Sequence, residues 1–412
     1  MDELQARLDD LRDRGLYRKL RLISGPQGPR VLLDGKPVLL LCSNNYLGLA
    51  DHPRVRQAAA DAAMRWGAGA GASRLVSGNM TIHRRLEERL AEFKGTESCL
   101  LFGSGYLANT GIISALAREG DVVFSDALNH ASIVDGCRLA RARTFIYDHC
   151  DVDHLEWGLR EAGGRGALIV TDGVFSMDGD IAPLERIVEV AHRYDARVMV
   201  DDAHGLGALG PGGRGSVAAA GLEDDVDIVV GTLGKALGSY GAYACTSRTM
   251  SKYLINTARS LIFSTALPPP AVAAAGAALD LLLEEPRRVE RLQRNATIMR
   301  EALAGHGMAT GDSSTQVLPI VVGVADDAVR VCERALEKGI FAQAIRPPTV
   351  PEGSSRLRLA VMASHTRAEL QEAAGTLAAA VRSIVGDRPK VTPVELPDAV
   401  RGRVFDGLAE AA

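Results

Sequence analysis

The chain has 412 residues, a length that suits two domains with cores large enough to need no disulfides. Apolar residues make up 47% and charged residues 24%, which excludes an intrinsically disordered protein. The 51 acidic and 47 basic residues nearly balance, so the charge gives no indication of a nucleic-acid or anionic membrane partner.

The six cysteines are scattered without a C-x-x-C pair, which predicts reduced thiols in a cytoplasmic protein and neither a disulfide framework nor a metal site. Residues 1–20 form a charged amphipathic pattern that lacks the apolar core of a signal peptide. No stretch approaches about 20 uninterrupted apolar residues, so no transmembrane helix is expected.

Residues 1–45 are expected to form a helical or extended N-terminal segment, and residues 46–270 a large domain. Within the latter, short runs rich in Val, Ile or aromatic residues alternate with glycine-rich loops and with helical patterns such as 81–93 and 183–194. This alternation predicts an α/β fold class, with a doubly wound, mostly parallel sheet that binds ligands beyond the carboxyl ends of its strands. The runs are SCLLF, DVVFSD, RTFIYD, ALIVTD, RVMVDD, VDIVVG and GAYACTS.

After LPPP, residues 271–386 have a different pattern, beginning with a helical stretch at about 271–305. The order strand, helix, strand, strand, helix follows, in QVLPIVVGV, 326–338, IFAQAIR, SRLRLAV and a helix from Arg367. It predicts a smaller α+β C-terminal domain. Residues 387–412 have no clear period and are expected to be a surface or disordered tail.

One of the seven lysines stands apart. Lys235 follows the apolar run VDIVVGT in TLGKALG, at the predicted carboxyl end of a buried strand, where a neutral amine could carry out carbonyl chemistry. A P-loop is the alternative, but Ala236 stands where that motif needs Ser or Thr. The other lysines lie in helical or polar-turn contexts that predict solvated surface: Lys19, Lys36, Lys94, Lys252, Lys338 and Lys390.

A second strand run, RVMVDDAHGLG, ends in the carboxylates Asp201 and Asp202 followed by His204. A metal site would need further ligands at recognisable spacing, and a hydrolase would need a nucleophile elbow; neither pattern is present. A carboxylate and a lysine at strand ends suit pyridoxal phosphate, because the acid keeps the pyridine nitrogen protonated.

That cofactor needs three further groups. FGSGYLAN places Ser104 and Gly105 between a strand and a helix, where backbone N–H groups and the helix dipole attract phosphate. His130, after the run DVVFSD, offers an imidazole for the ring face. Arg356 and Arg358 in SRLRLAV offer an anchor for a substrate carboxylate, although alternate arginines in a strand are also typical of a solvated edge.

Together these segments resemble the α-oxoamine synthases, pyridoxal phosphate enzymes of fold type I that condense an amino acid with an acyl-CoA. The similarity extends from about Asn44 to His365. Its motifs occur in the family's order: SNNYLGL, SGNMTIHRRLEERLAEF, LFGSGYLAN, NHASIVDG, TDGVFSMDGD, VDDAHGLG, GRGS, TLGKALG and LIFSTALPP.

The resemblance implies pyridoxal 5'-phosphate as cofactor and a homodimer with shared active sites. Lys235 would bind the cofactor aldehyde, Asp201 would pair with the pyridine nitrogen, and His204 would donate to the ring oxygen; with His130 over the ring, these are the predicted catalytic residues. The remaining implied cofactor residues are Ser176 beside the cofactor, Ser104, Gly105, Tyr106 and Thr232 at the phosphate, and Ser264 and Thr265, which would reach the neighbouring subunit's phosphate.

The resemblance also implies a substrate site, with Arg358 for the amino-acid carboxylate and with Arg21, Asn44, Ser77 and Thr349. RPPTVPEGSSRLRLAV and GAGASRLVSGN are most similar to the branch that makes 8-amino-7-oxononanoate in biotin synthesis. That branch condenses L-alanine with pimeloyl-CoA or pimeloyl carrier protein and releases CoA and CO2. The alternative is another branch, of the glycine C-acetyltransferase or serine palmitoyltransferase type.

Two hypotheses from other classes stay open at this point. One is a non-enzymatic pyridoxal phosphate carrier or an oligomeric regulator, which the set Lys235, Asp201 and His130 disfavours. The other is a different reaction on the same scaffold, such as transamination or retro-aldol cleavage, because fold type I supports many chemistries.

Overall fold

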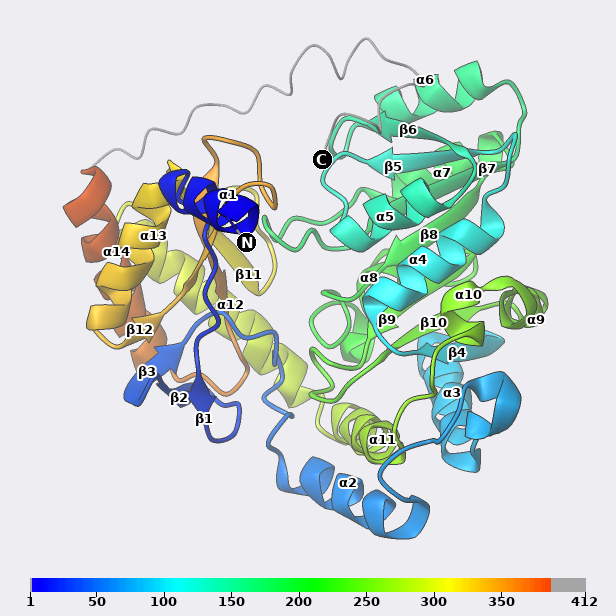
Figure 1. Ribbon diagram of the computed structural model, residues 1–412, viewed down its shortest axis with the longest axis horizontal. Coiled ribbons are helices and arrows are strands. Elements are labelled where there is room, and N and C mark those ends of the chain that lie inside the picture. Colours follow the sequence, from blue (N-terminus) through cyan, green and yellow to red (C-terminus); the bar gives the residue numbers. More distant parts are fainter. Residues whose placement is uncertain (1, 387–412) are drawn as a thin grey trace. The chain divides into compact units, whose positions relative to one another are not determined.

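The computed structural model describes residues 2–386, which form two compact units (Figure 1). Unit 1 comprises the chain up to Gly48, Met177–Asp180 and the chain from Glu290; unit 2 comprises Leu49–Ser176 and Ile181–Val289. The sequence-based division placed its domain boundary at 270 instead, and kept residues 1–45 apart from both domains. The predicted tail at 387–412 lies outside the described residues.

Unit 2 is built on a seven-stranded sheet with the strand order β4-β10-β9-β8-β7-β5-β6 (Figure 1). The pairs β5–β6, β5–β7, β7–β8 and β8–β9 are parallel, whereas β10 runs antiparallel to both β4 and β9. Each strand coincides with one of the seven apolar runs. The bounds are β4 Ser98–Phe102, β5 Val122–Asp126, β6 Arg143–Tyr147, β7 Ala167–Asp172, β8 Arg197–Asp201, β9 Ile228–Thr232 and β10 Ala242–Thr246.

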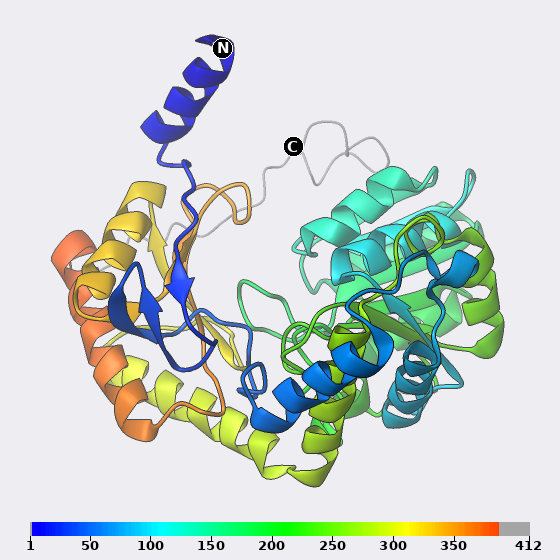
Figure 2. The same ribbon diagram turned by 60° about the horizontal axis from the view of Figure 1, so that its bottom comes forward.

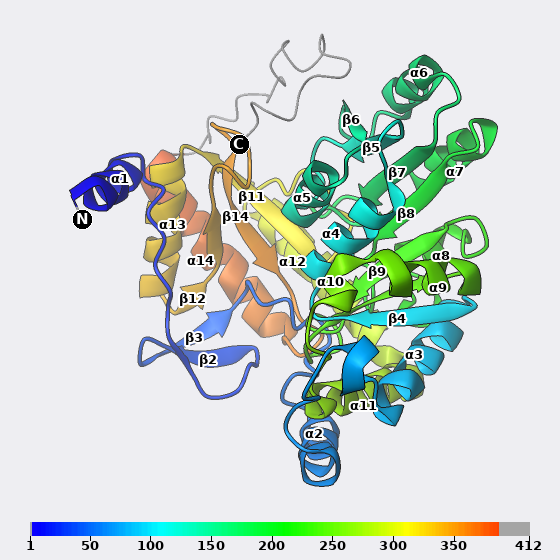
Figure 3. The ribbon, with the colours of Figure 1, turned by 45° about the vertical axis from the view of Figure 1, so that its right-hand side comes forward.

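Helices cover both faces of this sheet, as the doubly wound pattern predicts (Figure 3). Helices α3 (Thr81–Lys94), α6 (Val152–Ala162) and α7 (Leu184–Arg193) pack on one face, where the Cys245 thiol of β10 donates to the Leu90 carbonyl of α3. The opposite face carries α4 (Gly105–Leu116), α5 (Ala131–Leu139), α9 (Arg248–Thr257) and α10 (Arg259–Ile262), and α8 (Ser216–Ala220) lies beside α7.

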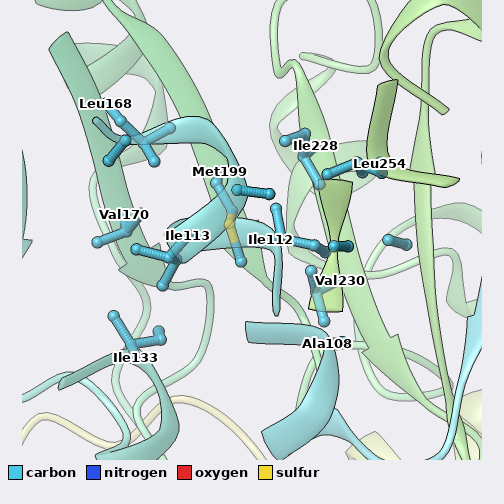
Figure 4. Packing of buried hydrophobic residues seen from close by; sticks show 14 of the residues in the cluster. Ala108, Ile112, Ile113, Ile133, Leu168, Val170, Met199, Ile228, Val230 and Leu254 are labelled. Carbon is cyan, nitrogen blue, oxygen red and sulfur yellow. The ribbon is translucent and has the colours of Figure 1, made fainter. Parts of the chain in front are cut away.

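Two isoleucines of α4, Ile112 and Ile113, are fully buried against the sheet (Figure 4). They share a cluster with Val170 of β7, Met199 of β8 and Val230 of β9. Complete burial of such a side chain contributes roughly 1.5–3 kcal/mol. This packing fixes the helix relative to the central strands, and therefore fixes its N-terminus at the carboxyl edge of the sheet.

Helices α2 (Pro53–Trp66) and α11 (Pro269–Glu284) lie side by side in unit 2 (Figure 2). The helical stretch expected at about 271–305 is two helices, because α12 (Arg287–Gly305) starts anew after Pro286. Proline has no backbone N–H to continue the α11 ladder, and its ring disfavours a helical residue before it. A π-helical turn, η1 (Arg74–Gly78), precedes α3.

Unit 1 holds two small sheets with the strand orders β1-β2-β3-β12 and β11-β14-β13. Strand β3 pairs in parallel with β12, with Leu39 opposite Ile340, and α13 packs beside α14 (Figure 3). The observed order from β11 to α14 is the predicted one, except that the run IFAQAIR forms two short strands, β12 and β13, in different sheets. The bounds are α1 Asp2–Asp13, β1 Ile23–Ser24, β2 Arg30–Leu33, β3 Lys36–Leu40, β11 Val317–Gly323, α13 Ala325–Glu337, β12 Ile340–Phe341, β13 Gln343–Ile345, β14 Ser355–Ala360 and α14 Arg367–Val385.

Within residues 2–386, none of the helices combines the length and the apolar character needed to cross a bilayer.

Candidate active site

Lys235 lies just beyond the end of β9 in unit 2, where the sequence predicted it. Its Nζ is 2.7 Å from Nε2 of the buried His204, which follows β8. The turn that carries Lys235 closes through Gly238, whose φ of +59° favours glycine and whose added Cβ would meet the Ala50 backbone nitrogen at 2.4 Å. The lysine amine therefore has a fixed position and an imidazole that can exchange a proton with it.

Asp201 ends β8 with its side chain on the α4 face. Oδ1 accepts from the Ala203 amide at 3.0 Å, and Oδ2 accepts from Asn109 Nδ2 of α4 at 2.6 Å. The same Asn109 amide group donates to Ser132 Oγ at 2.9 Å. Because all of these groups are buried, Asp201 is held in one orientation by short hydrogen bonds.

His130 caps the N-terminus of α5 and belongs to the same hydrogen-bonded chain. Its Nδ1 accepts from the Ser132 amide at 3.2 Å and lies 2.7 Å from Ser132 Oγ, so this nitrogen carries no proton. Desolvation lowers the pKa of His130, with Asp201 opposing this shift and Lys235 adding to it. The ring is accordingly a neutral imidazole, suited to stacking on an aromatic ring.

Asp172, at the end of β7, supports His130 from the other side. Its Oδ2 accepts from the His130 amide at 2.8 Å, and its own amide donates to Asn129 Oδ1 at 2.8 Å. Burial raises the pKa of Asp172 well above its usual range, and the neighbouring Asp201 raises it further. Sequence reasoning missed Asp172 and Asn109, although both lie within motifs that it singled out, because neither has a chemical pattern of its own.

The phosphate end of the predicted site shows an unsatisfied group. Thr232 Oγ1, at the end of β9, is buried without a hydrogen-bond partner among residues 2–386. Ser104 caps α4, and an added Cβ at Gly105 would lie 2.9 Å from Thr232 Cγ2, so the glycine leaves open space beside this hydroxyl. A helix N-terminus, a small residue and a free donor fit a phosphate group. The Tyr106 hydroxyl instead donates to Asp135 at 2.5 Å.

Asp202 does not share a site with Asp201. It accepts from Lys94 Nζ at 2.8 Å and from the Ser216 amide and hydroxyl at 2.9 and 2.7 Å, on the α3 side of the sheet. The prediction that Lys94 is solvated surface is wrong, since only 3% of its side chain is exposed. The charge is buried because α3 ends directly against this carboxylate.

The remaining predicted residues of unit 2 lie in three places. Ser176 is buried after β7, and Ser77 is exposed on η1. Ser264 and Thr265 follow α10 and line a small cavity together with Arg74 and others. The bridge between Ser73 and Thr265 ties this segment to the start of η1.

In unit 1, Arg358 lies on β14, the central strand of its sheet, and is buried. It donates to Asn44 Oδ1 at 3.1 Å and to the Tyr46 hydroxyl at 3.5 Å. Arg356 is also buried and forms an ion pair with Asp178. The alternative of a solvated arginine edge is therefore wrong, because β14 has neighbours on both sides.

Two further predicted substrate residues of unit 1 are partly engaged elsewhere. Arg21 pairs with Glu333 at 2.7 Å and with Asp34 at 3.6 Å, and its side chain is 31% exposed. Thr349 is exposed, and its amide donates to the Arg346 carbonyl at 3.1 Å.

The family model for aminotransferase class I and II matches residues 36–377. A relative from Citrifermentans bemidjiense, named 8-amino-7-oxononanoate synthase, is 57% identical over 380 residues, 92% of this chain and 97% of the relative. The chain belongs to the aminotransferase class I and II family. Relatives of the same name from Geobacter sulfurreducens and Lysinibacillus sphaericus are 54% and 48% identical over 91% and 90% of this chain, and the matches cover 97% and 95% of those relatives.

Solved structures of the family share the fold. A serine palmitoyltransferase from Sphingomonas wittichii superposes with a TM-score of 0.88 at 33% identity, over 93% of this chain and 97% of that one. An 8-amino-7-oxononanoate synthase from Francisella tularensis gives a TM-score of 0.73 at 28% identity, over 84% and 98%. These similarities confirm the predicted α-oxoamine synthase resemblance, the fold type I class and a pyridoxal phosphate enzyme.

Proposed function

We propose that this protein is a pyridoxal phosphate-dependent acyltransferase that condenses L-alanine with a pimeloyl thioester. The products are 8-amino-7-oxononanoate, the free thiol and CO2, as in a step of biotin synthesis. The observation that carries the proposal is the cluster of Lys235, His204, Asp201 and His130, in a chain 57% identical to a relative of that name. The cofactor supplies an electron-accepting ring that stabilises negative charge on the amino-acid Cα.

Residues of unit 2 have separate roles in the proposed reaction. Lys235 Nζ takes the proton from the substrate Cα, and His204 Nε2, at 2.7 Å, can receive or return a proton at the lysine nitrogen. The carboxylate of Asp201 would hold the proton of the pyridine nitrogen, and Asn109 orients that carboxylate. The neutral ring of His130 would cover one face of the cofactor.

The substrate carboxylate is assigned to Arg358 of unit 1. Its planar guanidinium can bind a carboxylate through two hydrogen bonds, and neutral oxygen atoms of Asn44 and Tyr46 orient it. Arg358→Lys should lower kcat/KM for alanine. The loss should correspond to about 1.5–3 kcal/mol of transition-state stabilisation, because lysine cannot bind a carboxylate through two parallel N–H groups. Arg356→Lys is the matched control, since Arg356 is paired with Asp178. Equal losses in both variants would contradict the assignment.

We propose a homodimer with shared active sites. The exposed large side chains of unit 2 include Leu75, Val76, Tyr106 and Phe263. Leu75 and Val76 directly precede Ser77, and Phe263 directly precedes Ser264. Exposed apolar groups of this kind are typical of an interface. Ser264 and Thr265 would then complete the phosphate site of the partner.

Subunit mixing tests the shared site. Lys235→Ala homodimers and homodimers of the double variant Ser264→Ala, Thr265→Ala should each be weakly active. After dissociation and mixing, heterodimers carry one intact site, so activity should return to about one quarter of the wild-type value. No recovery, with heterodimers demonstrated by mass spectrometry, would show that each subunit has its own complete site.

The reaction itself is tested by thiol release from a panel of acyl-CoA substrates and by rescue of a biotin-requiring strain that lacks its own synthase. Alanine with pimeloyl-CoA should be the best pair. Brisk turnover of serine with palmitoyl-CoA, or of glycine with acetyl-CoA, together with failed rescue would assign the chain to a sister branch. We also place the protein in the cytoplasm, which agrees with its cysteines being free thiols in the described residues.

A further inference from the structure

A second cluster of reactive side chains lies in unit 2 and does not include Lys235, Asp201, His204 or His130. It consists of Asp126 at the end of β5, and of His149 and Cys150 in the loop between β6 and α6. Each side chain offers one ligand or acid–base atom, and these atoms all lie within 4.8 Å of one another. The proposed function uses none of the three.

Asp126 fixes the orientation and the tautomer of His149. The carboxylate is 1% exposed and accepts from the Leu128 amide and the Cys150 amide, each at 2.8 Å. Its third contact is His149 Nδ1 at 2.9 Å, and a carboxylate that accepts hydrogen bonds from these amides leaves Nδ1 as a donor. The edge of the His149 ring also packs against Phe175, with ring centroids 4.4 Å apart.

With Nδ1 protonated, the lone pair of His149 is on Nε2, and this atom faces the thiol. Cys150 Sγ lies 3.7 Å from Nε2, within reach of an S–H···N hydrogen bond. Cys150 also has a φ of +56°, a backbone conformation that is uncommon for a residue with a Cβ and that is found preferentially at functional sites. The order thiol, imidazole, buried carboxylate is that of an activated nucleophile.

We infer that Cys150 is a nucleophilic thiol, activated by His149 and Asp126, and that it is a modification site for electrophiles and peroxides. With hydrogen peroxide, His149 Nε2 takes the thiol proton and the sulfur attacks one peroxide oxygen. An S–O bond forms as the O–O bond breaks, and the departing hydroxide takes the proton from the imidazolium to leave as water. Sulfur is oxidised to a sulfenic acid by two electrons and the peroxide is reduced.

The other cysteines differ from Cys150 in access. Cys99, Cys137, Cys245 and Cys332 are buried. Cys42 is partly exposed, but burial of its sulfur raises its pKa to about 12. A metal site is a weaker interpretation, because the Asp126 oxygens already accept from three donors and only two atoms remain as ligands.

The test is the rate of alkylation by iodoacetamide at each cysteine of the holoenzyme, followed by peptide mass spectrometry from pH 6 to pH 9. Cys150 should react at least about tenfold faster than Cys42 at neutral pH, and its rate should level off below the ordinary thiol pKa of about 8.5. Hydrogen peroxide followed by a sulfenic-acid-selective probe should label the same residue.

His149→Asn should slow alkylation of Cys150 by about tenfold at pH 7. His192→Asn is the matched control, since His192 is an exposed histidine of α7, and it should have no effect. The inference is overturned if Cys150 shows the pH profile of an ordinary thiol, or if the two histidine variants react equally. The pH profile of the wild type decides the matter should His149→Asn fold poorly.

Discussion

Two lysines, the buried Lys94 and the partly buried Lys235, contact residues that follow β8, and their surroundings differ in one respect. Lys94 ends α3 and is paired with the carboxylate of Asp202. Lys235 follows β9 and lies against the imidazole of His204. A carboxylate fixes an ammonium charge in place, whereas an imidazole can exchange a proton with an amine. The first environment stabilises the fold, and the second makes a lysine usable in a reaction.

The adjacent carboxylates Asp201 and Asp202 differ in the same way as the two lysines. Successive residues at the end of a strand point to opposite faces, so one carboxylate meets Asn109 of α4 and the other meets Lys94 of α3. Two neighbouring residues in the chain therefore have different roles: Asp201 belongs to the candidate active site and Asp202 to a structural ion pair. The following experiments test this division.

Lys235→Ala should have the largest effect on activity, a loss of at least about 10⁴-fold, because no second amine replaces the nucleophile. The variant should unfold at nearly the wild-type temperature. The measurements are thiol release and borohydride trapping of the cofactor, followed by peptide mapping. A cofactor trapped on a different lysine would disprove the assignment.

Lys94→Met should lower the stability of the fold and leave the activity nearly unchanged. Removing one partner of a buried ion pair leaves Asp202 without its counter-charge, which typically costs about 3–5 kcal/mol of stability. Urea unfolding followed by circular dichroism measures the loss, and specific activity at low temperature should stay near wild type. Lys252→Met, on the exposed side of α9, serves as the control. An unchanged unfolding midpoint would mean that the pair contributes nothing.

Another buried basic group, His365 of unit 1, differs from Lys94 and Lys235 because its ring nitrogens bond to backbone groups. Its Nδ1 accepts from the Met362 amide and its Nε2 donates to the Leu40 carbonyl, each at 3.0 Å. Burial lowers the pKa of His365 to about 4.

The unfolded histidine binds a proton near pH 6.5 and the folded one does not. The contribution of His365 to the free energy of unfolding is therefore complete above pH 6.5. It declines as the pH falls toward 4, by about 2 kcal/mol between pH 6.5 and pH 5. The unfolding free energy of wild type and of His365→Phe should be compared at several pH values, so that the difference isolates this group. Parallel pH curves would contradict the prediction.

Asn109→Ala should have the smallest effect, a loss of about 1–2 kcal/mol in transition-state stabilisation, because Asp201 keeps its charge but loses one hydrogen bond. Exchange of the alanine Cα proton with deuterated water is the measurement that reports on Asp201. Asn256→Ala, an exposed amide of α9 that donates to the Lys252 carbonyl, is the control. A complete loss of exchange would show that Asn109 does more than orient the carboxylate of Asp201.

Much of this arrangement could be predicted because the motifs carry local physical information. The run VDIVVGT became β9 with Lys235 beyond its end, and Ser104 caps α4 as the glycine turn before a helix indicated. Such features depend on neighbours in the chain. The break at Pro286 was also readable, but the helical pattern on both sides obscured it.

What could not be predicted depends on partners far apart in sequence. Lys94 meets a carboxylate 108 residues away, and Asn109 meets Asp201 across 92 residues. Amphipathic periodicity places a helix-terminal lysine on the surface, and only the packed sheet shows otherwise. The boundary at 289 was missed for the same reason, since the pairing of β3 with β12 joins the first and last parts of the chain.

That pairing of β3 with β12 has a consequence for how the protein is made. Leu39 leaves the ribosome some three hundred residues before Ile340, its partner in the ladder. The strands of unit 2 are all synthesised in between, so the seven-stranded sheet can form while β3 still lacks its partner β12. The N-terminal apolar strand is thus exposed throughout most of translation, and a chaperone that binds nascent chains would find its site there.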